Sequence, residues 1–414
     1  LIKSNSDASP RLLSLSMLDD DVRIPLGHPP LVLATPGAKE LVDKLVAHLG
    51  WPLGSCRYGE FQNGELSFKL ERTVANHDVF ILCVRDDLQA EVNFRLMQLL
   101  LLIDAVKGES PHKLTVVLPC LEYARQDRRL VAGEAIPPRL LLRCMRTAGA
   151  DRFLVIDLHN QAMTGFSPEN TVVDELSAEA YLADFVRTNV VAYTPEKLLV
   201  CATNGGGLRF TRRVADELGA GFLMADRFRP TAGAAKETRI ISHSQVGDVE
   251  AIVIVDDIFD TCGTLVEAAY ALRSWAPRAK LYAVATHGFF SAEAQTKIQK
   301  LVEETGLQWI AVTNSIAPGS ARARFESVGL QDHLQVIDIS RLIAGAILRI
   351  HLGASVNVPS FRSLGPRSVD EVLQASQLQH MTSDAEMGNT QNEYEDSSEP
   401  GSCSDEQESS FNRP

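Results

Sequence analysis

Short apolar runs rich in β-branched residues alternate with amphipathic stretches along most of the chain. The runs that predict strands are 31–34, 79–84, 114–118, 153–156, 198–201, 251–255, 281–285 and 309–312. Their near-continuous apolar character is typical of strands buried on both faces, as in a parallel sheet. The helices expected between them are 38–49, 91–106, 137–147, 176–187, 208–218, 265–274 and 292–305. This alternation predicts an α/β fold with crossover connections.

The number of expected strands and the chain length of 414 residues fit two similar α/β domains better than one sheet. We expect a mobile leader at 1–30, an N-terminal domain at 31–163, a C-terminal domain at 164–358 and a tail at 359–414. The tail ends in a stretch rich in Ser, Glu, Asp and Asn. Such a composition cannot bury enough apolar surface to offset the entropy of ordering, so we predict that the tail is disordered.

The net charge of -13 comes from 53 acidic and 40 basic residues. This balance argues against a protein that coats nucleic acid, which would normally be basic. Residues 384–414 carry nine acidic residues and one basic residue, a net of -8, which leaves -5 for the rest of the chain. For this acidic tail, a solubilising appendage is favoured over a specific docking arm.

The cysteines and the apolar stretches indicate the compartment. Seven cysteines are dispersed without a C-x-x-C pair, which is typical of reduced, buried thiols in a cytosolic-type compartment. The longest apolar stretch, near 99–103, is far shorter than the roughly 20 residues of a membrane span. The leader has no long apolar core and contains three consecutive acids at 19–21, which disfavours a secretory signal or transit peptide. We therefore expect a cytoplasmic protein with no membrane partner.

The most informative motif begins where an apolar strand ends in two adjacent carboxylates, Asp256 and Asp257. A turn at 260–264, Asp-Thr-Cys-Gly-Thr, then opens a helix, and such a turn favours a phosphate. The carboxylates would instead bind ribose hydroxyls, directly or through Mg²⁺. The alternative, an Asp-capped helix after a buried strand, is weakened by the second carboxylate. The residues expected to bind a sugar phosphate here are Asp256, Asp257, Asp260, Thr261, Cys262, Gly263 and Thr264.

By residue type alone, two further polar segments allow either a functional or a structural interpretation. Arg125 to Asp127 could supply phosphate and ribose donors, although a polar loop with an arginine salt bridge is the simpler interpretation. Asp157 and His159 end a buried strand, and at period two both side chains point to one face, where they could share a cation. A lone His in this position is more often a satisfied core residue.

The acidic strand end and its turn resemble the phosphoribosyl pyrophosphate (PRPP) loop of the type I phosphoribosyltransferase fold. Other segments occur in the order seen in ribose-phosphate diphosphokinases, also called PRPP synthetases. They are Phe-Gln-Asn-Gly-Glu at 61–65, Pro-Cys-Leu-Glu-Tyr-Ala-Arg-Gln-Asp-Arg at 119–128, Asp-Leu-His at 157–159 with Gly-Phe at 165–166, Thr-His-Gly-Phe-Phe-Ser at 286–291, and Val-Ile-Asp-Ile-Ser at 336–340. The resemblance spans about 31–358 and implies two tandem type I phosphoribosyltransferase-like domains, each with a mainly parallel sheet flanked by helices.

The resemblance implies a reaction in which the 1-hydroxyl of ribose 5-phosphate attacks the β-phosphorus of Mg-ATP and AMP leaves. The product would be PRPP for nucleotide biosynthesis, with Mg²⁺ as the cofactor. Catalysis would rest on positioning and charge neutralisation, because no covalent enzyme intermediate is needed. The resemblance also implies a homo-oligomer built from dimers, up to a hexamer, or a hetero-oligomer with related subunits. No nucleic-acid partner is expected.

The resemblance further implies roles for individual residues. The ATP-binding set is Phe61, Asn63, Glu65, Arg125, Gln126, Asp127, Arg128 and His159. Within it, Phe61, Asn63 and Glu65 look like the element that reaches ATP from a neighbouring subunit, although by residue type the Asn-Gly pair at 63–64 is a hairpin turn. The implied metal ligands are Asp157, His159 and Asp174.

The sequence departs from the family pattern at the positions expected to carry charge. The family's catalytic loop has a Lys and a nearby Arg after an apolar strand, and here Arg227 stands in the Lys position while Arg229 is retained. Asn204, in the expected ribose-phosphate site, replaces an Asp. A divergent diphosphokinase is the leading hypothesis, and a non-catalytic PRPP synthetase-associated, regulatory subunit is the second. The segments at 61–65 and 125–127 disfavour a transferase that consumes PRPP.

Overall fold

The computed structural model describes residues 28–86, 92–190, 194–228, 237–242, 249–356. Most of the expected leader, the whole of the expected tail and Arg229 lie outside these ranges. Among the described helices, none is long and apolar enough to cross a membrane.

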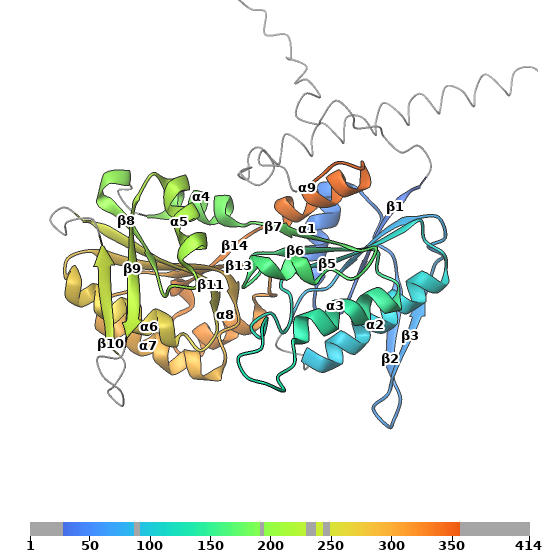
Figure 1. The fold of residues 1–414 in the computed structure, drawn as a ribbon, viewed down its shortest axis with the longest axis horizontal. Coiled ribbons are helices and arrows are strands. Elements are labelled where there is room, and N and C mark those ends of the chain that lie inside the picture. Colours follow the sequence, from blue (N-terminus) through green and yellow to red (C-terminus); the bar gives the residue numbers. More distant parts are fainter. Residues whose placement is uncertain (1–27, 87–91, 191–193, 229–236, 243–248, 357–414) are drawn as a thin grey trace, which may run out of the picture. The chain divides into compact units, whose positions relative to one another are not determined.

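The first sheet has five parallel strands in the order β1-β4-β5-β6-β7. The strands are β1 (Pro30–Ala34), β4 (Asp78–Leu82), β5 (Lys113–Leu118), β6 (Arg152–Ile156) and β7 (Val172–Leu176). The helices that follow these strands are α1 (Lys39–Leu49), α2 (Val92–Gly108), α3 (Pro137–Ala148) and α4 (Glu179–Asn189). A separate antiparallel pair, β2 (Cys56–Glu60) and β3 (Leu66–Leu70), projects away from this sheet as a hairpin (Figure 1).

The second sheet has seven strands in the order β10-β9-β8-β11-β12-β13-β14, and only the β9–β10 pair is antiparallel among them. The strands are β8 (Leu198–Ala202), β9 (Gly221–Phe228), β10 (Glu237–Ser242), β11 (Ala251–Phe259), β12 (Lys280–Gly288), β13 (Ile310–Thr313) and β14 (Leu334–Ile337). The helices are α5 (Leu208–Leu218), α6 (Gly263–Trp275), α7 (Ala292–Thr305), α8 (Gly319–Glu326) and α9 (Ser340–His351).

Both sheets are covered by helices on their two faces, as the apolar character of their strands requires. One core cluster joins α1, α4, α5 and α9 to one face of each sheet. Separate clusters place α6 and α7 on the other face of the second sheet, and α2 and α3 on the other face of the first. The expected fold, two mainly parallel sheets flanked by helices, is confirmed.

Local sequence explains where several helices begin and end. α3 starts with two prolines, Pro137 and Pro138, whose fixed φ suits the first helical turn. Gly219 follows the last residue of α5 and Gly306 follows that of α7, and both are left-handed, a conformation that glycine adopts without steric cost.

The eight expected strands and seven expected helices all occur, with ends shifted by a few residues. One expected helix, 176–187, begins later, because Leu176 is the last residue of β7 and the helix starts at Glu179. The elements that were not expected are β2, β3, β7, β9, β10, β14, α8 and α9.

The two sheets do not divide the chain at one point. β7 pairs with β6, so the first sheet extends past residue 163, where the N-terminal domain was expected to end. α9, near the end of the described chain, packs against α1, and Figure 1 shows the two helices side by side. The division into 31–163 and 164–358 therefore remains a prediction.

The described cysteines are all free thiols. Cys120, Cys201 and Cys262 are buried, as expected of thiols in apolar runs, and burial raises the pKa of each. Cys144 is exposed on α3 and differs from that expectation.

Candidate functional site

A cavity of about 520 Å³ lies at the carboxyl ends of strands from both sheets. This is the edge at which open α/β sheets bind ligands. Six of the residues singled out in the sequence line it together: Asp127, Arg128, Asp157, His159, Asn204 and Asp257. Residues expected to act on ATP and residues expected to bind ribose phosphate therefore face one volume.

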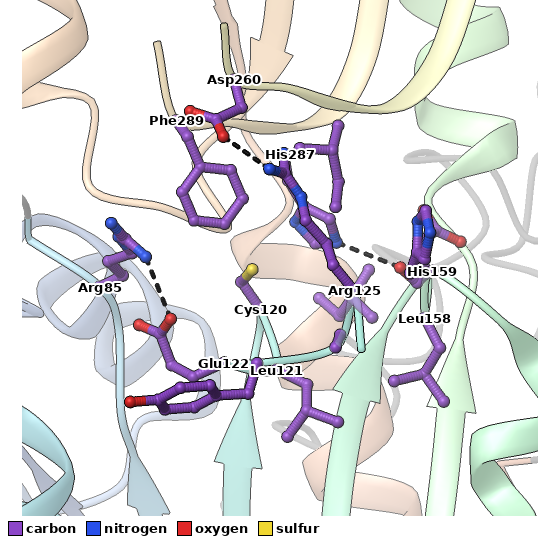
Figure 2. A pocket seen from close by; sticks show the side chains of 15 residues that line it. Arg85, Cys120, Leu121, Glu122, Arg125, Leu158, His159, Asp260, His287 and Phe289 are labelled. Carbon is purple, nitrogen blue, oxygen red and sulfur yellow. Dashed lines mark hydrogen bonds and ion pairs between the residues drawn. The ribbon is translucent and has the colours of Figure 1, made fainter. Parts of the chain in front are cut away.

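A neighbouring cavity of about 190 Å³ shares Asp157 and His159 with the first one. Figure 2 shows Arg125 and Asp260 pointing toward each other across it, and the Nη1 atom of Arg125 donates a 2.6 Å hydrogen bond to Oδ2 of Asp260. The guanidinium groups of Arg85 and Arg125 lie 4.5 Å and 5.7 Å from the centre of the Phe289 ring. These contacts join the segments after β4 and β5 to those after β11 and β12.

The two adjacent carboxylates at the end of β11 have different surroundings. Asp256 is buried and accepts a 2.5 Å hydrogen bond from Thr203 and one from the backbone N–H of Asp257. Burial and the charge of Asp257 raise the pKa of Asp256 well above its ordinary value, which favours the uncharged form. Burial also opposes ionisation of Asp257, but hydrogen bonds from His159 and Asp256 hold its pKa below the ordinary value. Of the pair, only Asp257 lines the larger cavity.

His159 forms an ion pair with Asp257 across the two sheets, at 2.7 Å between Nδ1 and Oδ2. This hydrogen bond raises the pKa of His159, and partial burial offsets part of the effect. The pair therefore places a cationic imidazole next to a carboxylate on the cavity wall.

Asp157 links the first sheet to the second. Its carboxylate accepts hydrogen bonds from Thr286 Oγ1 on β12 at 2.7 Å, from Ser177 Oγ at 2.9 Å and from the backbone N–H of Ala178 at 3.0 Å. Its own carbonyl oxygen accepts from Nε2 of His287 at 3.2 Å. Burial raises its pKa, and the φ of 39° is rare for a residue with a side chain. The oxygen atoms of Asp157 therefore accept hydrogen bonds mainly from groups that hold the fold together.

The expected phosphate turn, 260–264, opens α6. Cys262 is left-handed with a φ of 55° and caps the helix, which begins at Gly263. The carbonyl oxygen of Asp260 accepts from the backbone N–H of Ser291, and Thr261 is exposed. Asp260 lines the smaller cavity, whereas Thr261, Cys262, Gly263 and Thr264 line neither of the two cavities.

Asn204 closes the turn between β8 and α5. Its Oδ1 accepts from the backbone N–H groups of Gly206 at 2.7 Å and Gly207 at 3.2 Å, and its Nδ2 donates to Thr203 at 2.9 Å. The side chain therefore occupies amide donors that could otherwise bind an anion. The three consecutive glycines allow the backbone to line the cavity at this point.

The expected element at 61–65 is the tip of the β2–β3 hairpin. The backbone N–H of Phe61 donates to the carbonyl oxygen of Glu65, and Asn63 Oδ1 accepts from the N–H of Glu65 at 3.2 Å. The hairpin turn indicated by the Asn-Gly pair is therefore confirmed. Phe61 is 58% exposed, and the tip lines neither cavity of this chain.

The remaining residues of the loop after β5 differ in their contacts. Asp127 accepts a 2.5 Å hydrogen bond from Nδ2 of Asn160 and lines the larger cavity with the exposed Arg128. Gln126 is exposed and lines neither cavity.

Arg227 lies within β9 and not in a loop. Its guanidinium forms two contacts with Glu267 of α6, at 2.6 Å from Nε to Oε2 and 2.9 Å from Nη2 to Oε1. Asp226, the acid next to Arg227 in the sequence, pairs with Arg239 of β10. The second expected catalytic residue, Arg229, lies outside the described residues.

Of the three metal ligands implied by the resemblance, Asp157 and His159 line both cavities, but Asp174 lines neither. Asp174 is buried and pairs with Nε of Arg152 at 2.6 Å, away from both cavities. Among the described residues, no group of three or more His, Cys, Asp or Glu side chains could hold a metal ion. Mg²⁺ is usually held by one or two carboxylates plus substrate phosphates, so the carboxylates that line the larger cavity fit such a partial site.

The sequence motifs did not single out six residues that line the larger cavity: Asn160, Gln161, Glu175, Arg209, Phe210 and Arg213. Burial and the nearby Asp157 raise the pKa of Glu175 to about 7. Arg213 forms an ion pair with Glu179, the first residue of α4. The only available signal was the spacing of Arg209 and Arg213 on one helical face just after a Gly-rich turn.

Comparison with known proteins identifies relatives over most of the chain. The family models that match are the N-terminal domain of ribose phosphate pyrophosphokinase, over residues 31–149, and the phosphoribosyl synthetase-associated domain, over residues 231–362. The chain is 33% identical over 323 residues to ribose-phosphate pyrophosphokinase of Thermotoga maritima, covering 77% of this chain and 94% of that protein. It is 34% identical over 319 residues to ribose-phosphate pyrophosphokinase 2 of Schizosaccharomyces pombe, covering 77% and 93%. The crystal structure of PRPP synthetase from Mycobacterium smegmatis matches with a TM-score of 0.66 at 27% identity, covering 78% of this chain and all of that one.

Proposed function

Because the chain belongs to the ribose-phosphate pyrophosphokinase family, we propose that it transfers the diphosphate group of Mg-ATP to the 1-hydroxyl of ribose 5-phosphate. In this reaction a bond forms between the ribose 1-oxygen and the β-phosphorus. The bond from the β-phosphorus to the α–β bridging oxygen breaks, the hydroxyl proton is released, and AMP leaves. The product is PRPP.

One observation carries this proposal: a single cavity of about 520 Å³ is lined by the residues expected on both substrates. Asp127, Arg128 and His159 come from the side assigned to ATP, and Asn204 and Asp257 from the side assigned to ribose phosphate. Group transfer between two bound substrates needs both reacting ends in one water-poor volume, and holding them there supplies much of the rate.

The cationic side chains near this cavity supply charge for phosphate groups. Arg128, Arg209 and Arg213 line it, and Asp257 favours the cationic form of His159. Fixed positive charges stabilise a transition state in which negative charge builds up on the bridging oxygen that leaves with AMP. Mg²⁺, when bound, would neutralise further charge on the triphosphate.

Arg227 is the proposed catalytic cation of β9, with Arg229 beyond it in the chain. The pairing of Arg227 with Glu267 means that this guanidinium must leave its partner to reach a phosphate. The pair is partly exposed, so the cost of opening it is small. The proposed activity therefore includes a step in which the end of β9 rearranges.

The β2–β3 hairpin supports an oligomer in which neighbouring chains complete one another's nucleotide sites. Phe61 is exposed at its tip and lines neither cavity of its own chain, so a stacking role toward adenine requires another subunit. We propose a homo-oligomer, or a hetero-oligomer with related chains, on this ground.

The test is AMP release from ribose 5-phosphate and ATP by the purified full chain with Mg²⁺. We expect AMP and PRPP to form in equal amounts. No AMP from the chain alone, but stimulation of a catalytic relative on mixing, would instead identify a non-catalytic associated subunit. Release of phosphate without PRPP would reject the proposed transfer.

A further inference from the structure

The ring of Phe289, on the wall of the smaller cavity, lies between two guanidinium groups (Figure 2). The guanidinium carbon of Arg85 is 4.5 Å from the centre of the ring, and that of Arg125 is 5.7 Å from it. Both distances are within the roughly 6 Å over which a cation is attracted to an aromatic ring. The ring therefore gives Arg125 a surface to pack on, in addition to its hydrogen bond with Asp260.

Hydrogen bonds fix the backbone of both Arg85 and Phe289. The carbonyl oxygen of Arg85, beyond the end of β4, accepts from the N–H of Ala317 at 2.8 Å. The N–H of Phe289 donates to the carbonyl oxygen of Phe259, the last residue of β11, at 2.7 Å. These two residues are therefore held in place independently of the loop that carries Arg125.

Glu122 connects this fixed pair to the loop after β5, three residues before Arg125. Its Oε2 accepts from Nη1 of Arg85 at 3.1 Å, and its Oε1 accepts from Nη2 of Arg95 on α2 at 3.2 Å. The side chains of Glu122 and Arg95 are 14% and 5% exposed, so water competes little for these contacts. A carboxylate held by two guanidinium groups at such low exposure has little freedom to move.

The surroundings of Glu122 give it no direct role with a substrate. It lines the smaller cavity, but both of its oxygen atoms already accept from arginines. A carboxylate also repels the phosphate groups of a nucleotide, because the charges are alike. Its influence on the site therefore passes through Arg125, whose loop it anchors and whose ring partner also packs against Arg85.

We propose that Glu122 is a positioning residue for the nucleotide: by holding Arg85 against Phe289, it fixes the surface on which Arg125 is oriented toward ATP. The proposal rests on the proposed function, in which Arg125 acts on ATP. A guanidinium meets a phosphate through a planar fork of donors, so its orientation decides whether one or two hydrogen bonds form. Loss of the Glu122 charge should therefore weaken the binding of ATP more than the binding of ribose 5-phosphate.

The experiment is calorimetric titration of the full chain with Mg-ATP, and separately with ribose 5-phosphate. Glu122→Gln keeps the shape of the side chain and removes its charge. We expect about a 10-fold loss of ATP affinity, the lower end of the contribution of a charged hydrogen bond, and a change within about 3-fold for ribose 5-phosphate. The matched control is Asp151→Asn, because Asp151 also pairs with two cations, Arg146 and Lys107, but lines neither cavity. It should leave both affinities within about 2-fold of the parent, since distant sites act independently.

A double variant separates positioning through the ring from a purely structural ion pair. Phe289→Leu removes the ring and keeps an apolar side chain. In that background, Glu122→Gln should change ATP affinity by less than about 3-fold, because the ring that transmits its effect is absent. Circular dichroism checks the fold of every variant. If Glu122→Gln does not fold, Phe289→Leu alone should still weaken ATP binding about 3- to 10-fold, the contribution of one cation–π contact.

The inference is overturned if a folded Glu122→Gln variant binds ATP like the parent, if it loses affinity for both ligands equally, or if its effect and that of Phe289→Leu are additive. It is also overturned if Phe289→Leu binds ATP like the parent. AMP release by the same parent preparation tests the proposed function separately. The expected binding results without AMP release would reject only the activity, and AMP release with unchanged ATP affinity in both variants would reject only the role of Glu122.

Discussion

Arg125, in the loop after β5, donates a 2.6 Å hydrogen bond to Asp260, in the turn that opens α6. These residues are 135 positions apart in the chain, and the contact joins the side assigned to ATP to the side assigned to ribose phosphate. A contact in this position can make the binding of one substrate depend on the other.

We predict that Arg125→Ala and Asp260→Ala are non-additive in their effect on ribose 5-phosphate affinity. Isothermal titration calorimetry on the parent, both single variants and the double variant gives the interaction energy, which should be about 0.5–3 kcal/mol. The stability of the fold should change by no more than about 1 kcal/mol, because the pair is partly exposed. Additive losses of affinity would show that the two residues act independently.

Thr286→Val should loosen the connection between the sheets. The change keeps the shape of the side chain but removes the hydroxyl that donates to Asp157, and a lost buried hydrogen bond costs about 1–3 kcal/mol. Urea denaturation measures this loss, and steady-state kinetics should show a higher KM for both substrates.

The matched control for that prediction is Thr305→Val. Thr305 is also buried, but its hydroxyl donates to the carbonyl oxygen of Leu301 within α7, and the residue lines neither cavity. We expect it to lower stability without changing either KM. If both variants left the KM values unchanged, Asp157 would not position the site.

Much of the fold could be predicted because its central strands are apolar on both faces. β7 could not be predicted in this way, because Val172 is exposed and two of its five residues are acidic. β10 alternates exposed and half-buried residues at the edge of the second sheet, and lacks a continuous apolar run. α9 was missed for a different reason: nearly all of its residues are buried, and a short apolar run at 342–348 cannot be distinguished from a buried strand by its pattern alone.

The candidate site was predictable only where its residues are neighbours in sequence. Asp256 and Asp257 follow an apolar run in the sequence, and this pattern marks them as candidate site residues. The contact of Asp157 with Thr286 joins positions 129 apart, and no local pattern reveals it. Asp174 lies in the core while its neighbour Glu175 lines the cavity, and this difference follows only from knowing that β7 is a strand and which of its faces is covered.

Arg227→Lys should raise turnover, and Arg227→Ala should nearly abolish it. A compact ammonium can approach a transferring phosphoryl group more closely than a planar guanidinium, and a misplacement of about 1 Å can cost 10²-fold in rate. Steady-state AMP release measures kcat for each variant. Arg229→Ala should also lower kcat with little effect on stability.

The control for Arg227 is its observed partner, Glu267. Glu267→Gln removes the charge that holds Arg227 on β9, so it should leave kcat unchanged or raise it. If Arg227→Ala turned over like the parent, Arg227 would have only a structural role beside Glu267.

Asp78 should make the fold sensitive to acid. Burial opposes its ionisation, but hydrogen bonds from His351 at 2.8 Å and His112 at 2.6 Å hold its pKa below the ordinary value of 3.8. A carboxylate whose pKa is lower in the folded than in the unfolded state stabilises the folded state at pH values above its unfolded-state pKa. This stabilisation is lost as the pH falls through the folded-state pKa. Asp78→Asn should therefore cost about 1.5–3 kcal/mol at pH 7.

Urea denaturation at pH 7 and at pH 3 measures this difference, which should shrink at the lower pH. Asp43→Asn is the control, because Asp43 is exposed and pairs with the exposed Lys39, so it should change stability by less than about 1 kcal/mol. An equal loss for Asp78→Asn at both pH values would contradict the role of its charge.

The two carboxylates at the end of β11 should differ in their effect on ribose 5-phosphate binding. Asp257→Asn removes a charge that faces the cavity and pairs with His159, so affinity should fall about 10- to 100-fold, equivalent to the 1.5–3 kcal/mol of a charged hydrogen bond. Asp256→Asn should have an effect below about 3-fold, because burial and its neighbour already favour an uncharged side chain there, and an amide resembles a protonated carboxyl. Calorimetric titration of each variant with ribose 5-phosphate, and separately with ATP, checks both expectations. Equal losses of ribose 5-phosphate affinity for the two variants would mean that Asp256 is also charged and acts on the sugar. A loss of affinity for ATP alone would mean that neither residue binds ribose 5-phosphate.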